Sequence, residues 1–348
     1  MEPVTHMLTG AVLARAGINR KAAYASVAMA IAAELPDVDV LWGLGGPVTG
    51  FEHHRGITHT FLATPLEALL VTGYFWATHR LRKRAPEAEP NWLWLFGGCW
   101  LALLSHLLLD WTNNYGLRPF FPFNPKWYAG SFVFIFEPVL FVLLLGALVM
   151  PALFGLVNSE VGARRVKFRG RGWAIAALFG VAGLYGFRFA EHSRAIALAE
   201  QNQPEGTTRI FASPHPLNPF IWSVVSDTPE FYQLSTVDTR RAEVLPATPS
   251  DTLYKPPETL AIMAAKRTYL GRIYLDWSML PVLSEARVDD DPNHPLVQVT
   301  FADARFMYDA LLVSGRSNPP LTGTVTLDMA APEGQRVVEM RMGNRVQR

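Results

Sequence analysis

The chain has 348 residues, enough for about two domains, and half of its residues are hydrophobic while only 18% are charged. This balance favours a membrane protein. A net charge of +1 excludes the strongly basic composition of most nucleic-acid-binding proteins, so no nucleic-acid partner is expected. The single cysteine, Cys99, lies in an apolar run and cannot form an intrachain disulfide.

The N-terminal region predicts two short helices. Its first residues lack the basic stretch and the small-residue cleavage site of a secretory signal, so His6 is expected to stay in the protein. Residues 7–18 and 22–34 are apolar, but each is shorter than the roughly 20 helical residues that a bilayer crossing takes. We expect the second helix to stop at Pro36 and a glycine-rich loop to cover residues 43–50.

Four longer apolar segments predict membrane-spanning helices. They cover residues 60–78, 92–111, 132–157 and 173–190. A basic run at residues 79–84 follows the first segment, and another at residues 164–171 separates the last two. The positive-inside rule places both runs in the cytoplasm, so the opposite ends of the segments are predicted to be extracytoplasmic.

The rest of the chain predicts a water-facing domain, because proline becomes frequent and the long apolar runs stop. Alternating apolar and polar residues predict strands at 296–301, 322–327 and 336–341, and residues 257–275 fit an amphipathic helix. The predicted fold class is a mainly α-helical polytopic membrane domain with a C-terminal α+β soluble domain. The expected parts are residues 1–190 for the membrane domain, 191–207 for a linker and 208–348 for an extracytoplasmic α+β domain.

Histidine and acidic residues gather at the ends of segments that are predicted to be extracytoplasmic. They are His6, the acidic group Glu34, Asp37 and Asp39, the stretch from His53 to His59, and the pair His106 and Asp110. His106 and Asp110 are four residues apart, so on a helix they project from one side with their Cβ atoms about 5–6 Å apart. Imidazole and carboxylate ligands suit zinc, manganese or iron. The expected cofactor is a divalent metal, zinc being the first choice, and hydrolysis is the natural reaction class.

Other interpretations of these residues stay open. A single histidine in an apolar helix is more often structural than a ligand, but an ionisable pair inside a membrane span is costly and indicates function. Asp37 and Asp39 could cap a helix end, and His53 could be a solvated loop residue. Arg55 could orient a carboxylate, bind an anion such as phosphate, or anchor the chain at the interface. Glu137 lies in an apolar segment but belongs to no cluster.

Four ordered motifs resemble a known family. They are Thr5-His6-x3-Gly10, Leu35-Pro36-Asp37-x-Asp39, His54-Arg55-Gly56-Ile57-Thr58-His59 and Ser105-His106-x3-Asp110. They are similar to motifs of the bacterial inner-membrane proteins classed as metal-dependent hydrolases, a family also named for LexA binding and for its YdjM member. The resemblance covers residues 1–190 and extends through residues 212–222 to a longer subgroup. As metal ligands or catalytic groups it implies His6, Asp37, Asp39, His54, His59, His106 and Asp110.

We therefore predict a hydrolase of the bacterial inner membrane that acts on a lipid-linked or membrane-proximal ester. A phosphoester is favoured, because the His-x3-Asp helix also resembles one in zinc phospholipases and nucleases. We expect Asp37, Asp39 or Glu34 to act as general base and Arg55 to stabilise developing negative charge. Membrane lipids are the expected partners, and no oligomeric state follows from the sequence. The alternative is a non-catalytic scaffold or partner-binding protein whose polar cluster holds helices together.

Overall fold

The computed structural model describes residues 1–81, 90–160, 170–289, 294–310, 313–316 and 319–347. The chain forms two compact units. The first comprises Met1–Asp39 and Arg55–Phe189, and the second comprises Val40–His54 and Ala190–Arg348. No sequence pattern indicates that residues 40–54 belong with the C-terminal part of the chain. The assignment of a membrane domain, a linker and an extracytoplasmic domain stays a prediction.

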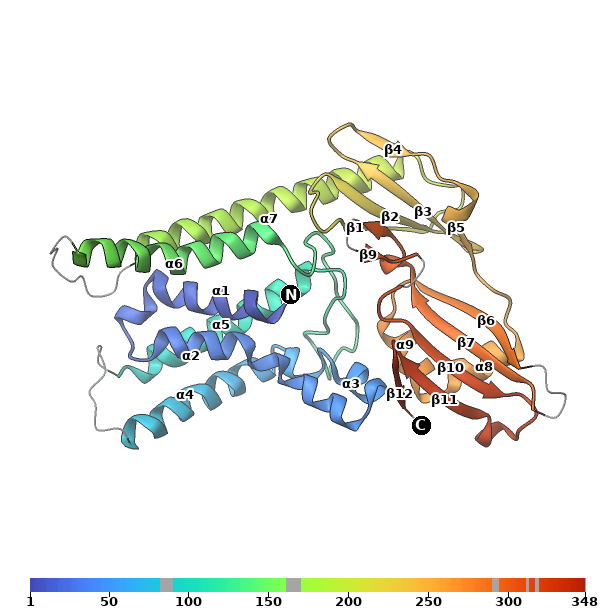
Figure 1. The fold of residues 1–348 in the computed structure, drawn as a ribbon, viewed down its shortest axis with the longest axis horizontal. Coiled ribbons are helices and arrows are strands. Elements are labelled where there is room, and N and C mark those ends of the chain that lie inside the picture. Colours follow the sequence, from blue (N-terminus) through green and yellow to red (C-terminus); the bar gives the residue numbers. More distant parts are fainter. Residues whose placement is uncertain (82–89, 161–169, 290–293, 311–312, 317–318, 348) are drawn as a thin grey trace. The chain divides into compact units, whose positions relative to one another are not determined.

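The first unit is helical (Figure 1). The two expected short helices are α1 (Pro3–Ala16) and α2 (Ala25–Glu34), and they pack against each other. Both contact α5 (Trp92–Thr112), which also lies along α4 (Ala63–Leu81). A buried core rich in alanine side chains joins these helices, and such small side chains let helix backbones approach closely.

Gly10 lies where α1 packs closely against α2. A Cβ atom at this position would overlap the carbonyl oxygen of Met29 and would lie 2.8 Å from the Cβ of Ala33. The glycine of the motif Thr5-His6-x3-Gly10 therefore has a packing role.

We expect Gly10→Ala to destabilise the first unit by about 1–3 kcal/mol, because the added methyl group forces α1 and α2 apart. Gly73→Ala is the matched control, since a Cβ at position 73 of α4 meets nothing within 4 Å. Thermal unfolding of both variants in detergent measures the difference. Equal melting temperatures for the two variants would contradict the packing role of Gly10.

Two further helices complete the first part of the chain. They are α6 (Pro138–Glu160), which packs against α1, and α7 (Arg171–Glu200). Among the described residues, three helices are long and apolar enough to cross a membrane, namely α5, α6 and α7. The remaining expected span, residues 60–78, corresponds to α4, which contains Glu67 and has His79 and Arg80 in its last turn and is therefore less hydrophobic. Half of the first basic run, residues 82–84, and most of the second, residues 164–169, lie outside the described residues, so the orientation stays a prediction.

A buried ion pair connects α7 to the residue that precedes α6. Nη2 of Arg188 lies 2.8 Å from Oε2 of Glu137, and both side chains are buried. Ionisable residues among apolar helices are costly unless they are paired. Glu137, which belongs to no cluster in the sequence, is thus paired with Arg188, a residue that no sequence motif marks.

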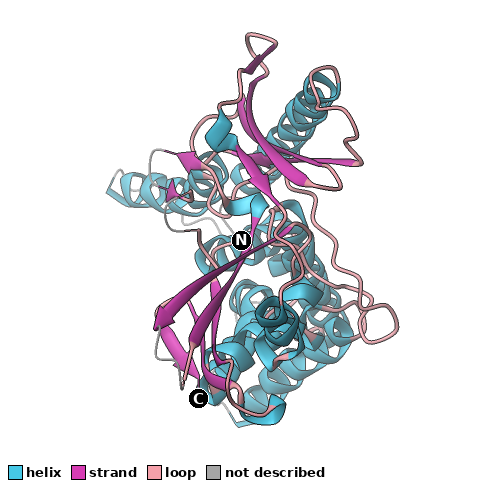
Figure 2. Ribbon diagram, turned by 90° about the vertical axis from the view of Figure 1, so that its right-hand side faces the viewer, coloured by secondary structure: helices cyan, strands magenta, loops and turns pink. Residues whose placement is uncertain are grey.

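The second unit contains two five-stranded antiparallel sheets, as Figure 2 shows in magenta. In the first sheet the order is β1-β2-β3-β4, and β5 also pairs with β3. Its strands are β1 (Arg209–Pro214), β2 (Ile221–Asp227), β3 (Phe231–Asp238), β4 (Glu243–Leu245) and β5 (Thr252–Tyr254).

The second sheet has the order β12-β11-β10-β7-β6. Its strands are β6 (Pro281–Asp289), β7 (Leu296–Asp303), β10 (Gly323–Asp328), β11 (Val337–Met342) and β12 (Arg345–Gln347). The short strands β8 (Asp309–Ala310) and β9 (Val313–Ser314) form a separate pair. The three strands expected from alternation are confirmed as β7, β10 and β11, and the expected α+β class is confirmed with them.

Three local predictions need correction. The single helix expected over residues 257–275 is two helices, α8 (Leu260–Arg267) and α9 (Tyr269–Trp277), because Thr268 is extended and caps α9 by accepting a hydrogen bond from the Gly271 amide. The linker expected over residues 191–207 is helical up to Glu200, since α7 continues past residue 190. The glycine-rich loop expected over residues 43–50 contains the end of a 3-10 helix (Leu35–Gly45) and the start of α3 (Pro47–His53).

Candidate metal centre

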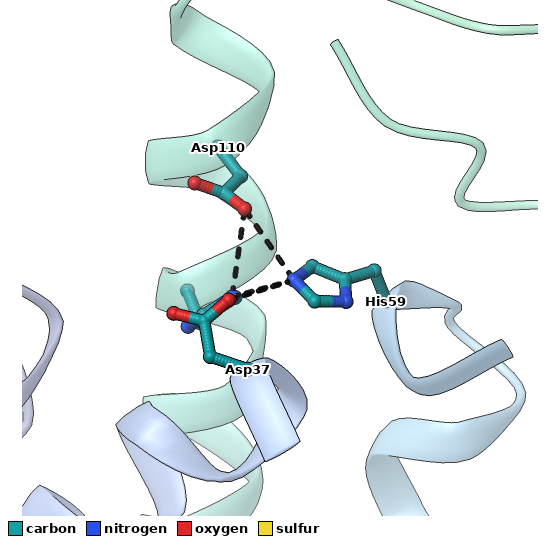
Figure 3. Close-up of side chains that lie close together, drawn as sticks. Asp37, His59 and Asp110 are labelled. Atoms are coloured by element: carbon teal, nitrogen blue, oxygen red, sulfur yellow. Dashed lines mark hydrogen bonds and ion pairs between the residues drawn. The ribbon is translucent and has the colours of Figure 1, made fainter. Parts of the chain in front are cut away.

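Four side chains from separate parts of the chain converge in the first unit. Asp37 lies on the 3-10 helix that follows α2, His59 ends a short 3-10 helix (Ile57–His59), and His106 and Asp110 lie one turn apart on α5. One ligand atom from each of the four lies within 4.8 Å of all the others. Figure 3 shows Asp37, His59 and Asp110 pointing toward one another. Two imidazoles and two carboxylates therefore meet at one point.

The separations between these atoms fit the coordination shell of a small cation. Nε2 of His59 lies 3.3 Å from Oδ1 of Asp37, 3.5 Å from Oδ2 of Asp110 and 3.1 Å from Nε2 of His106. Nε2 of His106 lies 3.5 Å from Oδ2 of Asp110 and 3.8 Å from Oδ1 of Asp37. Tetrahedral zinc, with bonds of about 2.0–2.2 Å, separates its ligand atoms by about 3.3–3.6 Å. Three of the five separations fall in this range, and the other two differ from it by 0.2 Å.

Both histidines have a partner on the nitrogen that faces away from the cluster. Nδ1 of His106 lies 2.7 Å from the carbonyl oxygen of Ala33, which can only accept a hydrogen bond. Nδ1 of His59 lies 3.3 Å from Oδ2 of Asp39 and 3.1 Å from the hydroxyl oxygen of Thr58. A proton held on Nδ1 leaves the lone pair of Nε2 for a metal, and metal-bound histidines usually have such a partner.

Arg55 orients one oxygen of Asp110. Its Nη2 lies 2.7 Å from Oδ1 of Asp110, while Nη1 donates to Oδ1 of Asn113 and to the carbonyl oxygen of Gly116. The other oxygen, Oδ2 of Asp110, faces the two histidines, is buried and has no hydrogen-bond partner among the described residues. A buried carboxylate oxygen without a donor is costly, and a cation would satisfy it. Asn113 was not among the predicted site residues, although it lies three residues after Asp110.

Asp39 lies behind His59, on the side away from the four donor atoms. Its Oδ2 accepts a hydrogen bond from the backbone N–H of Arg55 at 2.7 Å and also faces Nδ1 of His59. Arg55 has a left-handed backbone conformation with φ of 53°, which is uncommon for a residue other than glycine. In this position Asp39 orients the ring of His59. Its predicted role as a ligand stays a prediction.

His6 lies beside the four residues. Its fully buried ring stacks on His106 with the ring centroids 3.8 Å apart, and its Nε2 is 3.3 Å from Oδ1 of Asp110, the oxygen that Arg55 also contacts. The backbone nitrogen of Met1 contacts the same oxygen. Burial and the neighbouring His106 lower the pKa of His6 to about 3, so its imidazole is neutral.

The other predicted site residues lie outside the group of four. Glu34 ends α2, and its Oε2 is buried without a hydrogen-bond partner among the described residues. Burial, together with the charge of Asp37, raises the pKa of Glu34 to about 7. His54 directly follows α3 and belongs to the second unit with His53, whose ring stacks on Trp42.

The cluster attracts positive charge. Burial alone would lower the pKa of His59, but the neighbouring carboxylates of Asp110 and Asp37 raise it to about 9. Asp39 adds a third carboxylate, and Arg55 compensates part of this charge. A divalent cation that displaces the proton of His59 would find the same attraction.

The fold and this cluster define a polytopic membrane protein with a buried group of histidine and aspartate side chains that could hold a metal ion. The chain matches the family of the YdjM inner membrane protein over residues 1–195 and belongs to that family. The matched region contains all four side chains of the cluster and ends before the two sheets.

The chain is also similar to the uncharacterized protein YfhP of Bacillus subtilis strain 168. It is 27% identical over 122 residues, which are 35% of this chain and 35% of YfhP. The match thus spans about a third of that relative's length. No solved structure matches this chain significantly.

Proposed function

We propose that this protein is a metal-dependent hydrolase of the inner membrane that cleaves a phosphoester in or next to the lipid bilayer. The observation that carries the proposal is the convergence of Asp37, His59, His106 and Asp110 at metal-ligand spacing. Zinc is the preferred metal, since two imidazole and two carboxylate ligands suit it. By the positive-inside rule we place the site on the extracytoplasmic side.

A bound divalent cation supplies Lewis acidity toward a phosphoryl oxygen and lowers the pKa of a water molecule. The side chains around it divide the remaining tasks. Glu34 is the general base in this proposal, since a carboxylate whose pKa is about 7 can accept a proton and release it near neutral pH. The hydrogen bonds of Asp39 and Arg55 support positioning roles, Asp39 for His59 and Arg55 for Asp110.

Exposed apolar side chains next to the ligands support a lipid-linked substrate. Val38 lies between the two aspartates of its motif, and Ile57 and Phe61 flank His59, yet all three are between 45% and 49% exposed. Exposed apolar groups around a polar site mark contact with a membrane or with an apolar ligand. A phosphoester on a lipid would bring both kinds of surface to this place.

The test is metal analysis combined with hydrolysis assays on phospholipid and nucleotide esters, comparing the wild type with Asp110→Asn. We expect the wild type to retain zinc and to hydrolyse an ester. The asparagine has nearly the same shape without the charge, so it should lower zinc affinity by more than the roughly 10–100-fold that loss of an outer-shell partner costs. The exposed variant Glu333→Gln, in the second unit, is the control.

A wild-type protein that binds no divalent ion would overturn the proposal. It would favour a structural role for the cluster instead. The hydrogen bonds from His106 to Ala33 and from Arg55 to Gly116 connect separate segments of the first unit, as such a role requires.

A further inference from the structure

Residues 40–54, called the excursion below, connect two motifs of the metal centre but belong to the second unit. The chain leaves the first unit directly after Asp39 and returns to it at Arg55. At the base of the excursion the backbone N–H of Arg55 donates to Oδ2 of Asp39 over 2.7 Å. One hydrogen bond thus fastens the two ends together, and both ends are continuous with cluster residues, Asp37 on one side and His59 on the other.

The last strand of the second sheet holds the helix of this excursion. Oε1 of Gln347, in β12, accepts hydrogen bonds from the backbone N–H groups of Val48 and Thr49, at 2.8 and 3.3 Å. Nε2 of the same side chain donates to the hydroxyl of Thr49. Gln347 therefore caps the first turn of α3, whose N–H groups lack partners within the helix.

Helix α9 holds the other end of α3. The hydroxyl of Tyr269 donates to Oε2 of Glu52. The ring of Phe51 packs against Tyr274 and Trp277, with ring centroids 5.8 and 5.1 Å apart. These polar and aromatic contacts span α3, so the segment is a packed part of the second unit.

We propose that the C-terminal domain braces the metal centre through this segment, with Gln347 and Tyr269 as positioning residues. A loop whose tip is fixed has fewer conformations at its base, so the bond between Arg55 and Asp39 opens less often. Asp39 orients His59, and Arg55 orients Asp110, so an intact base keeps the donor atoms preorganised. The effect on metal affinity rests on the proposed function, whereas the effect on the base does not.

The experiment compares full-length wild type, Tyr269→Phe and the double variant Gln347→Ala/Tyr269→Phe in detergent. Hydrogen exchange at the amide of Arg55 is measured without metal, and zinc affinity is measured by competition with a chelator. The phenylalanine removes only a hydroxyl group, so it should leave the fold intact. Arg345→Ala, an exposed position on β12, is the control. Exchange in strands β2 and β3 reports whether the second unit stays folded.

We expect the Arg55 amide to exchange several-fold faster in Tyr269→Phe and faster again in the double variant, with β2 and β3 unchanged. Zinc affinity should fall about tenfold in the double variant, as when an outer-shell partner of a metal ligand is lost. Unchanged exchange at Arg55 in both variants would contradict the proposed role of Gln347 and Tyr269. A wild type that binds no zinc would overturn the proposed function instead. The exchange rate of the Arg55 amide would still show whether the C-terminal domain stabilises the bond between Arg55 and Asp39.

Discussion

Replacing His106 by alanine should lower zinc affinity by more than 100-fold and abolish hydrolysis. The side chain contributes one of the four donor atoms, and its Nδ1 is held by the carbonyl oxygen of Ala33, so its Nε2 is directed toward the other three donors. The loss should exceed the roughly 10–100-fold that removal of an outer-shell partner costs. Zinc content after dialysis and chelator competition both measure it.

Three other histidines provide a graded comparison. His6→Ala should have a smaller effect than His106→Ala, because His6 supports the ring of His106 and contacts the oxygen of Asp110 that faces away from the other donors. His54→Ala should lower zinc affinity less than His6→Ala does. His79→Ala should leave zinc affinity unchanged, since His79 bonds to the hydroxyl of Tyr24. Equal losses for His6→Ala and His106→Ala would show that the centre includes His6.

Arg55→Met should destabilise the metal-free protein by about 3–5 kcal/mol, which is the usual effect of removing one partner of a buried ion pair. Methionine fills part of the space but removes the guanidinium donor from the carboxylate of Asp110 and the carbonyl of Gly116. Zinc at the cluster would compensate some of the negative charge that Arg55 now neutralises. The variant should therefore lose less stability with zinc than without it.

Thermal unfolding in detergent, with and without saturating zinc, tests both parts of this prediction. Arg55→Lys is the informative companion variant, because it keeps the charge but cannot reach Asp110, Asn113 and Gly116 together. The stability of Arg55→Lys should lie between that of the wild type and that of Arg55→Met. A loss of stability that is the same with and without zinc would show that Asp110 does not face a bound cation.

Much of the candidate centre could be predicted from the sequence because its residues are out of place in apolar surroundings. His106 and Asp110 interrupt a long hydrophobic run at helical spacing, which marks them as a pair. The different positions of Asp37 and Asp39 could not be predicted in this way. The 3-10 helix that carries them has about three residues per turn, so side chains two positions apart point to different sides. Asp37 thus faces the donor atoms while Asp39 lies behind His59.

The parts of the fold that sequence patterns missed share a physical reason. Strand β2 is buried along almost its whole length, so it lacks the alternation that revealed β7 and β10. The pairing of Glu137 with Arg188 joins residues far apart in the chain. The contact between α3 and β12 likewise depends on tertiary structure. The capping residue Gln347 lies about 300 residues along the chain from the amides whose hydrogen bonds it accepts.

The hydrogen bond between His106 and the carbonyl oxygen of Ala33 limits how the chain can change during evolution. A backbone acceptor survives any substitution at its own position, so point mutations at residue 33 cannot remove it directly. Inserting or deleting one residue in α2 would instead rotate this carbonyl by about 100° around the helix axis. The length of α2 is therefore under stronger constraint than its side chains, and natural variation in this segment should consist of substitutions rather than insertions or deletions.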